Sequence, residues 1–417
     1  MNAFTHIHQV WEALERIPRF KDSGANAVHY ALTGIEQLCD LVGNPQNELN
    51  GIHIAGTNGK GTTAHLLEHI YCEAGYSVGL FTSPHLMRYN ERVRVGKEEI
   101  PDEDIINYFN LINPLLEEQS VTFFEISTGL AFWYFRQKNV DIAVIETGLG
   151  GRLDSTNIIT PLCSIITSIG YDHQDVLGHT LENIAYEKAG IIKNSIPVVI
   201  GNIPDQVKPV IRRKAKDVGS RVWDCSELNP AFHHGRVHLT DGRQWNTTFI
   251  EPVNAWNVTC AVQCVALLNR AFPVEEQQLN TAIETCPPFH ARFEKLTVDR
   301  DWYFTGAHNE QALAATLEAV QRVEEGRTPI LIFTLMNDKL TPEVAACLRQ
   351  FPVRWFLESD SPRALTNDEL GNWVEADTFT ERMVLEKLDD LTPELVIFAG
   401  SFYFYSTVRR WIGEIQP

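Results

Sequence analysis

A glycine-rich turn in the first quarter of the chain combines the residue types that bind phosphate. Residues 51–63 read Gly-Ile-His-Ile-Ala-Gly-Thr-Asn-Gly-Lys-Gly-Thr-Thr, an apolar run followed by closely spaced glycines and Lys60. Glycines expose backbone N–H groups that can surround an anion, and a helix beginning after them directs the positive end of its dipole to the same place. Lys60 can reach terminal phosphates, and a threonine hydroxyl can lie near Mg2+. We therefore predict nucleotide binding at this turn.

The spacing of this turn departs from the common P-loop pattern. Gly61 separates Lys60 from Thr62, and Ile54 stands where the first glycine of the pattern would be. The alternative is an ordinary strand-to-helix turn. The cluster of Gly56, Gly59 and Gly61 around one lysine, directly after an apolar run, favours phosphate binding over that alternative.

Other polar residues follow apolar runs elsewhere in the chain. Ser83, Glu146 and His173 each come at or just after the end of a run that we predict to be a strand. Ligands of open α/β sheets collect at the carboxyl ends of strands, so these side chains are expected near the glycine turn. A hydroxyl, a carboxylate and an imidazole at such a place suit Mg2+ that also bridges phosphate oxygens.

Each of these residues also has an ordinary interpretation. Ser83 precedes Pro84 and could be a turn residue, His173 could be a loop histidine, and Lys188 could be a helix lysine. Glu146 is harder to explain in this way, because a carboxylate ending a buried strand needs a cation or hydrogen-bond donors. The prediction of a metal site therefore depends on the whole set.

Apolar runs alternate with amphipathic runs, which is typical of an α/β protein with a mostly parallel sheet. In the N-terminal part, the predicted strands are residues 52–55, 78–81, 142–146, 164–168 and 198–200, and the predicted helices are residues 63–74, 102–117, 127–137, 181–191 and 255–270. Alternating stretches with His-Gly and Asp-Gly turns in residues 221–251 predict a small antiparallel patch.

The best candidate for a linker is residues 286–291, where Pro287 and Pro288 prevent a continuous helix. A second α/β series follows, with strands predicted at residues 302–305, 329–334, 355–357 and 395–399 and helices at residues 342–349, 403–412 and from about 311. We predict an N-terminal P-loop domain of residues 1–285 and a smaller, Rossmann-like α/β domain of residues 292–417.

Composition narrows the classes of partner. A chain of 417 residues exceeds one ordinary core, which agrees with two domains. The formal net charge of −19 argues against nucleic acid, whose binding needs a basic surface. The sequence has no apolar run long enough to span a bilayer and no secretory signal, so no membrane partner and a cytoplasmic location are expected. The eight cysteines show no zinc spacing and are expected to be reduced thiols.

Several segments form one recognisable pattern. They are residues 56–63, Thr82-Ser-Pro-His85, Asn90-Glu-Arg-Val-Arg94, Phe124-Glu125, residues 146–157, Asp172-His173 and Glu187-Lys-Ala-Gly-Ile-Ile-Lys193. The pattern resembles bacterial folylpolyglutamate synthases of the Mur ligase superfamily. The resemblance spans the chain, with motifs densest between residues 51 and 200. It implies a Mur ligase-like fold in which the C-terminal domain serves glutamate ligation.

The resemblance implies that ATP phosphorylates a carboxylate of a folate and that L-glutamate attacks the acyl phosphate to form an amide. By position, the ATP-binding residues would be Thr57, Asn58, Gly59, Lys60, Gly61, Thr62, Asn257, Arg292 and Thr305. Ser83, Glu146 and His173 would hold Mg2+, and a carbamylated Lys188 would support a second metal ion. The folate pocket would include Thr122, Phe123, Phe124, Glu125, Leu153, Asp154 and Ser155. Lys60, Lys188 and His308 would be catalytic, with His308 acting either on phosphate or as a base. The partners would be ATP, L-glutamate and a reduced mono- or polyglutamylated folate, and the chain is expected to be a monomer.

The chain departs from the family at a few positions. Thr305 stands where an aspartate usually contacts the ribose, and Leu340 replaces the second aspartate of an Asp-Lys-Asp motif. Asn254 replaces a glutamine near Asn257. Bifunctional members carry a Gly-Leu-x-Arg-like segment near residue 30, whereas residues 29–35 contain no arginine, so dihydrofolate synthase activity is not expected.

Two alternatives remain open on the sequence alone. Thr305 and Leu340 are compatible with a catalytically weakened paralogue that binds nucleotide or folate as a regulatory protein. A Mur-type ligase with another acceptor is the second alternative. The matches at Phe124-Glu125 and Leu153-Asp154 favour a pterin-containing acceptor over that second alternative.

Overall fold

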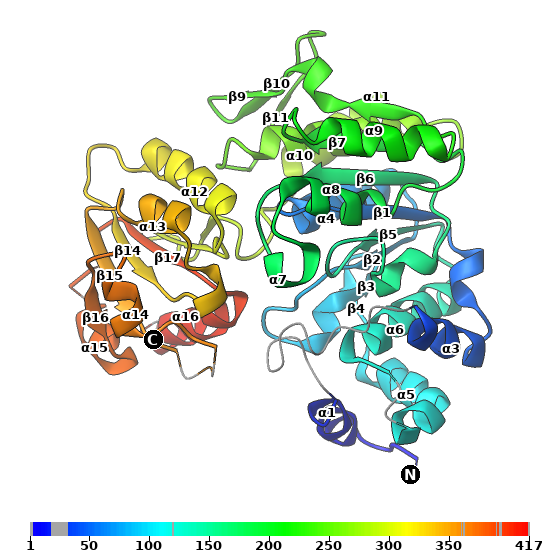
Figure 1. The fold of residues 1–417 in the computed structure, drawn as a ribbon, viewed down its shortest axis with the longest axis horizontal. Coiled ribbons are helices and arrows are strands. Elements are labelled where there is room, and N and C mark those ends of the chain that lie inside the picture. The colour runs from blue at the N-terminus through cyan, green and yellow to red at the C-terminus, as the bar shows by residue number, and fades with distance from the viewer. Residues whose placement is uncertain are drawn as a thin grey trace. The chain divides into compact units, whose positions relative to one another are not determined.

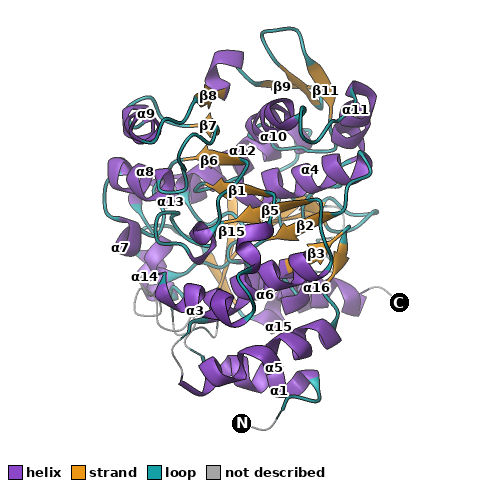
Figure 2. Cartoon of the chain, turned by 90° about the vertical axis from the view of Figure 1, so that its right-hand side faces the viewer, coloured by secondary structure: helices purple, strands orange, loops and turns teal. Residues whose placement is uncertain are grey.

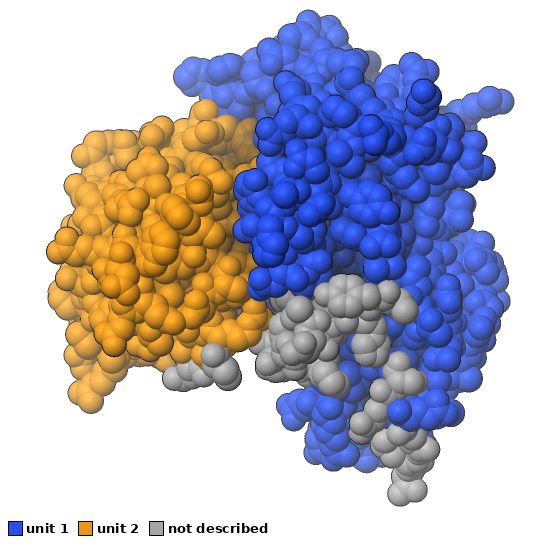
Figure 3. Space-filling view, in the orientation of Figure 1, with its two compact units in different colours: residues 1–247, 255–286 blue, residues 248–254, 287–417 orange. Residues whose placement is uncertain are grey.

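A computed structural model describes residues 3–17, 32–118, 121–359, 361, 363–388, 390–391 and 394–415. The chain divides into two compact units (Figure 3). The first contains Met1–Thr247 and Ala255–Cys286, and the second contains Thr248–Asn254 and Pro287–Pro417. The second unit therefore takes a short segment from within the sequence of the first.

An eight-stranded sheet forms the centre of the first unit, in the order β4-β3-β2-β5-β1-β6-β7-β8 (Figure 1). Its strands are β1 Gly51–Ala55, β2 Val78–Phe81, β3 Val93–Val95, β4 Glu98–Glu99, β5 Ile142–Glu146, β6 Cys163–Ser168, β7 Val198–Asn202 and β8 Val222–Asp224. All eight strands run parallel apart from β3, which is antiparallel to both of its neighbours β2 and β4. Strands β1, β2, β5 and β6 are buried along their whole length, which explains their continuous apolar runs.

Helices cover both faces of this sheet. Helices α4 Lys60–Glu73, α10 Asn254–Leu268 and α11 Glu276–Thr285 lie on one side, and α8 Leu181–Ala189 and α9 Lys208–Asp217 lie on the other (Figure 2). The remaining helices are α1 Ile7–Glu15, α3 Thr33–Leu41, α5 Asp102–Glu118, α6 Phe123–Gln137 and α7 Gln174–Leu177, with short 3-10 turns η2 Pro45–Glu48, η3 Tyr89–Arg92, η4 Ser155–Ile158 and η5 Cys225–Leu228. A small antiparallel sheet contains β9 Ala231–His233, β10 Arg236–His238 and β11 Gln244–Asn246.

The second unit has its own six-stranded sheet, in the order β12-β13-β17-β14-β15-β16. Its strands are β12 Glu294–Lys295, β13 Trp302–Thr305, β14 Ile330–Phe333, β15 Val353–Leu357, β16 Asp377–Phe379 and β17 Val396–Ala399, all parallel except β12. Its helices are α12 Glu310–Val323, α13 Pro342–Leu348, α14 Asn367–Gly371, α15 Glu381–Lys387 and α16 Phe402–Ile415, and η6 spans Asn337–Lys339. Buried side chains such as Leu313, Phe333 and Phe356 give this unit a separate core.

The predicted α/β fold class is confirmed, and most predicted elements of the large sheet agree with the structure to within a few residues. Helix α6 begins at Phe123 rather than at residue 127, because Thr122 and Glu125 form a capping box that starts the helix earlier. The sequence analysis does not predict helices α1, α3, α7, α9, α11, α14 and α15. None of the helices in the described part of the chain combines the length and apolar character needed to cross a membrane.

Candidate functional site

The glycine turn joins β1 to α4, and two of its glycines are required by close packing. Gly59 precedes the first turn of α4 with a left-handed φ of 84°, and a Cβ there would lie 2.3 Å from Asn257 Oδ1. A Cβ at Gly56 would lie 1.9 Å from Thr167 Oγ1. Glycine at these positions lets the backbone approach α10 and β6, so the sequence fixes the shape of the turn.

Side chains and backbone groups at the end of β6 hold the turn in place. Thr57 Oγ1 donates to the Gly170 carbonyl over 3.1 Å and accepts from the Gly170 N–H over 3.0 Å. Asn58 N donates to Ser168 Oγ over 2.9 Å, and Thr167 Oγ1 donates to the Asn58 carbonyl over 2.6 Å. The N–H groups of Lys60, Gly61 and Thr62 at the start of α4 have no acceptor within the helix, as expected of an anion-binding helix end.

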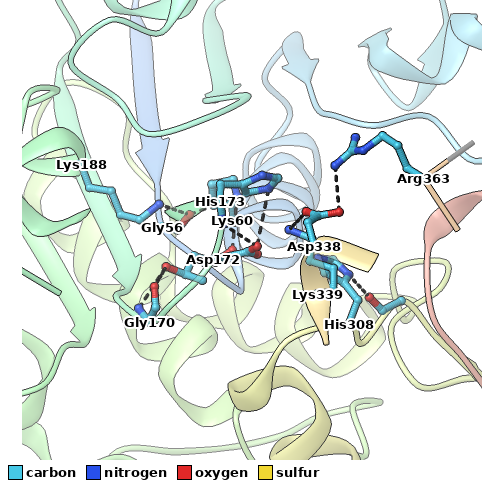
Figure 4. A network of polar contacts seen from close by, with 12 residues as sticks. Gly56, Lys60, Gly170, Asp172, His173, Lys188, His308, Asp338, Lys339 and Arg363 are labelled. Carbon is cyan, nitrogen blue, oxygen red and sulfur yellow. Dashed lines mark hydrogen bonds and ion pairs between the residues drawn. The ribbon is translucent and has the colours of Figure 1, made fainter. Parts of the chain in front are cut away.

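Two lysines converge on the Gly56 carbonyl oxygen. Lys188 Nζ donates to it over 2.9 Å and Lys60 Nζ over 3.1 Å, and Figure 4 shows the Lys188 amine at this oxygen. Lys188 is buried, on a helix that packs against the sheet, with 3% of its surface exposed. Burial and the nearby Lys60 lower the pKa of Lys188 to about 7, although Asp172 and Asp154 act in the opposite direction. A substantial fraction of Lys188 is therefore neutral at physiological pH.

Strand register places Glu146 beside the turn. Ile54 of β1 pairs with Glu146 at the end of β5, and Glu146 is almost completely buried. Its Oε2 accepts a hydrogen bond from the backbone N–H of Ser83 over 3.0 Å. The structure therefore brings two of the three predicted metal ligands together at the carboxyl ends of neighbouring strands.

His173, the third predicted metal ligand, follows β6 and has a left-handed φ of 49°. Its N–H donates to Asp172 Oδ1 over 2.9 Å, and its Nε2 lies 3.8 Å from the same oxygen. Among the described residues, no group of three or more His, Cys, Asp and Glu side chains could enclose a metal ion. One hydroxyl, one carboxylate and one imidazole nevertheless fit Mg2+, which usually keeps several waters and binds substrate phosphates.

The predicted folate segment at Thr122–Glu125 begins α6. Glu125 Oε2 accepts from the Thr122 N–H over 2.7 Å, and the Glu125 N–H donates to Thr122 Oγ1 over 3.3 Å. The Phe124 ring packs directly on Gly148, where a Cβ would lie 2.4 Å from the ring. The Arg92 guanidinium lies 5.1 Å from the Phe123 ring centroid. These residues therefore have a structural role in addition to any role in binding.

Asp154 of the second predicted folate segment lies in a buried hydrogen-bond chain. Its Oδ2 accepts from the Leu149 N–H over 2.8 Å, and its Oδ1 accepts from the Thr156 hydroxyl over 2.5 Å. That hydroxyl lies 2.8 Å from His53 Nε2, so His53 must donate to it. Burial lowers the pKa of His53 to about 3 and raises the pKa of Asp154. Leu153 and Ser155, on either side of Asp154, are only partly buried.

Asn257 lies on α10 within the first unit, next to the glycine turn. Its Oδ1 accepts from Thr63 Oγ1 over 3.4 Å and lies 2.3 Å from the position that a Cβ at Gly59 would take. The structure therefore brings this residue, predicted to contact adenine, to the start of α4. Thr62, which also belongs to α4, is buried.

In the second unit, Thr305 ends β13 and the segment Gly306–Asn309 leads into α12. Thr305 is buried, and its Oγ1 accepts from the Ala307 N–H over 3.3 Å. His308 Nδ1 lies 2.7 Å from the Gly306 carbonyl, which assigns the proton to Nδ1 and makes Nε2 the acceptor nitrogen of the neutral ring. A phosphate oxygen would need a donor at Nε2, so contact with phosphate requires the protonated ring.

Arg292 follows the linker, and its guanidinium lies 4.6 Å from the centroid of the Phe402 ring. Glu251 is buried in the same unit, and desolvation raises its pKa to about 7 even though Arg292 acts to lower it. Sequence reasoning did not select Glu251 or Phe402. Neither belongs to a recognised motif, and only the fold brings them close to Arg292.

The structure shows what Asn254 and Leu340 contact at the positions where they depart from the family pattern. Leu340 packs against the core of the second unit, which explains an apolar residue there. Asp338, two residues before Leu340, forms an ion pair with Arg363, with 2.9 Å between Oδ1 and Nη2 (Figure 4). The Asn254 side chain hydrogen-bonds to Glu251, which favours the ionised form of that carboxyl.

Comparison with known proteins gives consistent matches. Residues 54–265 match the model of the Mur ligase middle domain. The chain is 32% identical to the folylpolyglutamate synthase of Lacticaseibacillus casei, over 89% of this chain and 92% of that protein. It is also 32% identical to the dihydrofolate synthase/folylpolyglutamate synthase of Bacillus subtilis, over 90% of this chain and 93% of that protein. A solved structure of a bifunctional folylpolyglutamate synthase/dihydrofolate synthase with Mn, AMPPNP and L-glutamate bound aligns with a TM-score of 0.85 at 26% identity, covering 99% of each chain.

Proposed function

Since this chain belongs to the folylpolyglutamate synthase family, we propose that it is an ATP-dependent ligase that extends the glutamate tail of a folate. The γ-phosphoryl group of ATP passes to the γ-carboxylate of the folate, which leaves ADP and an acyl phosphate. The amine of L-glutamate then attacks the acyl carbon, loses a proton and releases phosphate. The comparisons support this ligase activity rather than a non-catalytic paralogue or a ligase with another acceptor.

The observation that carries the proposal is the convergence of Lys60 and Lys188 on one carbonyl oxygen of a turn that requires glycine. The reaction brings a carboxylate against a triphosphate, so it needs concentrated positive charge. In our proposal Lys60 and the N–H groups of Gly59 to Thr62 bind the phosphates, and Arg292 adds a further positive charge. Asn257 and Thr305 contact the nucleoside, and His308 in its protonated form acts on phosphate.

Ser83, Glu146 and His173 are the residues that would hold Mg2+. The ion would neutralise charge on the phosphates when bound. The partly neutral Lys188 fits carbamylation, because only an uncharged amine attacks CO2, and its pKa of about 7 supplies that form near neutral pH. The resulting carboxylate would be a ligand for a second metal ion, which gives the proposed site two metal positions.

The acceptor we propose is a reduced folate with one or more glutamates, bound by Thr122–Glu125 and Leu153–Ser155. The relative from Bacillus subtilis is named for both dihydrofolate synthase and folylpolyglutamate synthase. The lack of an arginine in residues 29–35 is the sequence feature that argues against dihydrofolate synthase activity. Residues 29–31 of this segment lie outside the described residues. We propose the folylpolyglutamate synthase (tetrahydrofolate synthase) activity, by a monomer.

The proposal is tested by measuring phosphate release from ATP with each substrate omitted in turn. We expect release only when Mg2+, L-glutamate and a reduced folate monoglutamate are all present, together with a product one glutamate longer by mass spectrometry. A parallel reaction with dihydropteroate replaces the folate and tests the second activity. Release that is independent of folate and glutamate would contradict the proposal.

A further inference from the structure

Phe402 begins α16 at the edge of the second sheet where Thr305 ends β13. Thr305 pairs with Ala399 at the end of β17, so the chain segments after both strands leave the sheet side by side. Between β17 and α16 stands Gly400, whose φ is 137°. A Cβ at Gly400 would lie 2.2 Å from the Thr334 carbonyl oxygen. This close packing fixes where α16 begins and therefore where the Phe402 ring lies.

The ring of Phe402 contacts three parts of the proposed site at once. The Arg292 guanidinium lies 4.6 Å from its centroid, within the range of a cation–π interaction. The His308 ring is oriented edge-to-face to it at an interplanar angle of 76°, with 6.3 Å between centroids. The ring also packs on the backbone of Gly306, where a Cβ would lie 2.5 Å from Phe402 Cε1.

Gly306 is a glycine for a reason that concerns this ring. Gly306 does not have a positive φ, so its backbone conformation does not demand glycine. The three nearest atoms to an added Cβ all belong to Phe402. The absence of a side chain at Gly306 is what allows the ring to reach both Arg292 and His308.

We propose that Phe402 is a positioning residue for nucleotide binding, whose aromatic face holds the Arg292 guanidinium and whose ring packs edge-to-face with His308. Arginine side chains have many rotamers, and ordering one before the ligand arrives reduces the entropy lost on binding. The ring adds this order to the electrostatic attraction that the buried Glu251 carboxylate already exerts on Arg292. This inference rests on the proposed function, in which Arg292 and His308 act on the ATP phosphates.

The test compares Phe402→Leu, which keeps apolar bulk, with Phe402→Tyr, which keeps the aromatic face. The readout is the dissociation constant for the non-hydrolysable analogue AMPPNP with Mg2+, measured by calorimetry on the full chain. We expect Phe402→Leu to weaken binding about fivefold, from the strength of a partly desolvated cation–π contact, and Phe402→Tyr to bind as the unchanged chain does. Phe404→Leu is the matched control, because Phe404 lies on the same helix but packs against Phe304 and Trp411.

A double-variant cycle separates positioning from a general structural effect. If Phe402 acts through Arg292, Phe402→Leu costs no further affinity in an Arg292→Ala background, apart from the smaller share that passes through His308. Gly306→Ala provides an independent route to the same answer: we expect it to weaken AMPPNP binding in the unchanged chain but much less beside Phe402→Leu, where the smaller side chain leaves room.

Two results would overturn the inference while the proposed function stands. The first is an AMPPNP affinity that Phe402→Leu leaves unchanged. The second is a loss of AMPPNP affinity on Phe402→Leu that is equal in the unchanged chain and in the Arg292→Ala background. If the unchanged chain binds no AMPPNP, the proposed function fails and the inference fails with it. If Phe402→Leu does not fold, as judged by its thermal unfolding, Gly306→Ala in the unchanged chain decides the question, and unchanged AMPPNP affinity in that variant would overturn the inference.

Discussion

The first unit holds its glycine turn through hydrogen bonds that involve side chains at the end of β6, whereas the second unit holds the Arg292 side chain against an aromatic ring and on a left-handed stretch of backbone. Thr167, Ser168 and Gly170 at the end of β6 bind the turn between β1 and α4. By contrast, Arg292 stands between Ala291 and Phe293, both of which have a left-handed φ, at 58° and 45°. The first arrangement depends on particular polar side chains and on glycines, and the second depends on ring packing and on glycines that make room for it.

This difference explains where the chain departs from the family pattern. The departures at Thr305, Leu340 and Asn254 lie in the second unit, and each residue has a packing or hydrogen-bonding role there. The turn residues Gly56 and Thr57 cannot change as freely, because a Cβ at Gly56 would collide with Thr167 and the Thr57 hydroxyl both donates to and accepts from Gly170.

The largest expected effect tests the first unit. Lys60→Ala removes a charge at the proposed phosphate site, and we expect turnover to fall by about 10³-fold or more while the fold is kept. Steady-state phosphate release measures the loss, and thermal unfolding checks the fold. Lys295→Ala, at an exposed lysine paired with Asp301, is the control and should leave turnover unchanged. Turnover retained in Lys60→Ala would remove the glycine turn from the mechanism.

The second prediction concerns the buried amine of the first unit. The ordinary pKa of lysine, 10.5, falls to about 7 at Lys188. Between these values the unfolded chain binds a proton that the folded chain lacks, so the free energy of unfolding rises with pH by up to about 1.4 kcal/mol per unit. Below pH 7 both states are protonated and this contribution is flat.

Lys188→Met should lack that rise. Urea unfolding at pH 7, 8 and 9, with bicarbonate removed so that the amine stays unmodified, measures the slope for both chains. Lys295→Met is the control, because its hydrogen bond to Asp301 raises the pKa of Lys295 and moves its titration out of this window. Equal slopes for the unchanged chain and Lys188→Met would show that Lys188 remains charged when folded.

The sequence was sufficient to predict the central strands of the first unit's sheet, because β1, β2, β5 and β6 are buried along their whole length and appear as continuous apolar runs. It did not predict the edge strands β3 and β4, and it assigned β8 to an antiparallel patch although β8 pairs in parallel with β7. It also identified the glycine turn, whose residues are adjacent in the chain. It could not predict Phe402 or Glu251 beside Arg292, because these contacts join segments far apart in sequence and involve no motif. The placement of Thr248–Asn254 in the second unit is a long-range property of the same kind.

The third prediction tests whether packing in the second unit has replaced a charged contact. Thr305→Asp restores a carboxylate where the family usually has one, and the new side chain can still accept from the Ala307 N–H. We expect AMPPNP to bind up to about tenfold more tightly, from one charge-assisted hydrogen bond to the ribose. Thr305→Asn is the control, since it has the same shape without the charge. No change in Thr305→Asp would mean that another residue contacts the ribose.

The smallest expected effect is a change in the free energy of unfolding, which we expect to have opposite signs for a glycine exchange in the two units. Ala291 is buried, its N–H donates to Glu294 Oε2 over 2.9 Å, and its carbonyl accepts from the Gly306 N–H over 2.8 Å, so its left-handed backbone is fixed from both sides. That conformation costs a non-glycine residue about 1–2 kcal/mol, while glycine loses about 0.5–1 kcal/mol more entropy on folding.

We therefore expect Ala291→Gly to raise the free energy of unfolding by up to about 1 kcal/mol, measured by urea denaturation. Gly59→Ala in the first unit should lower it by at least as much, because its φ of 84° is equally left-handed and its Cβ would also collide with Asn257. A loss of stability in Ala291→Gly would mean that the methyl group contributes more through packing than the backbone costs. The second unit would then resemble the first in requiring its own residue at this turn.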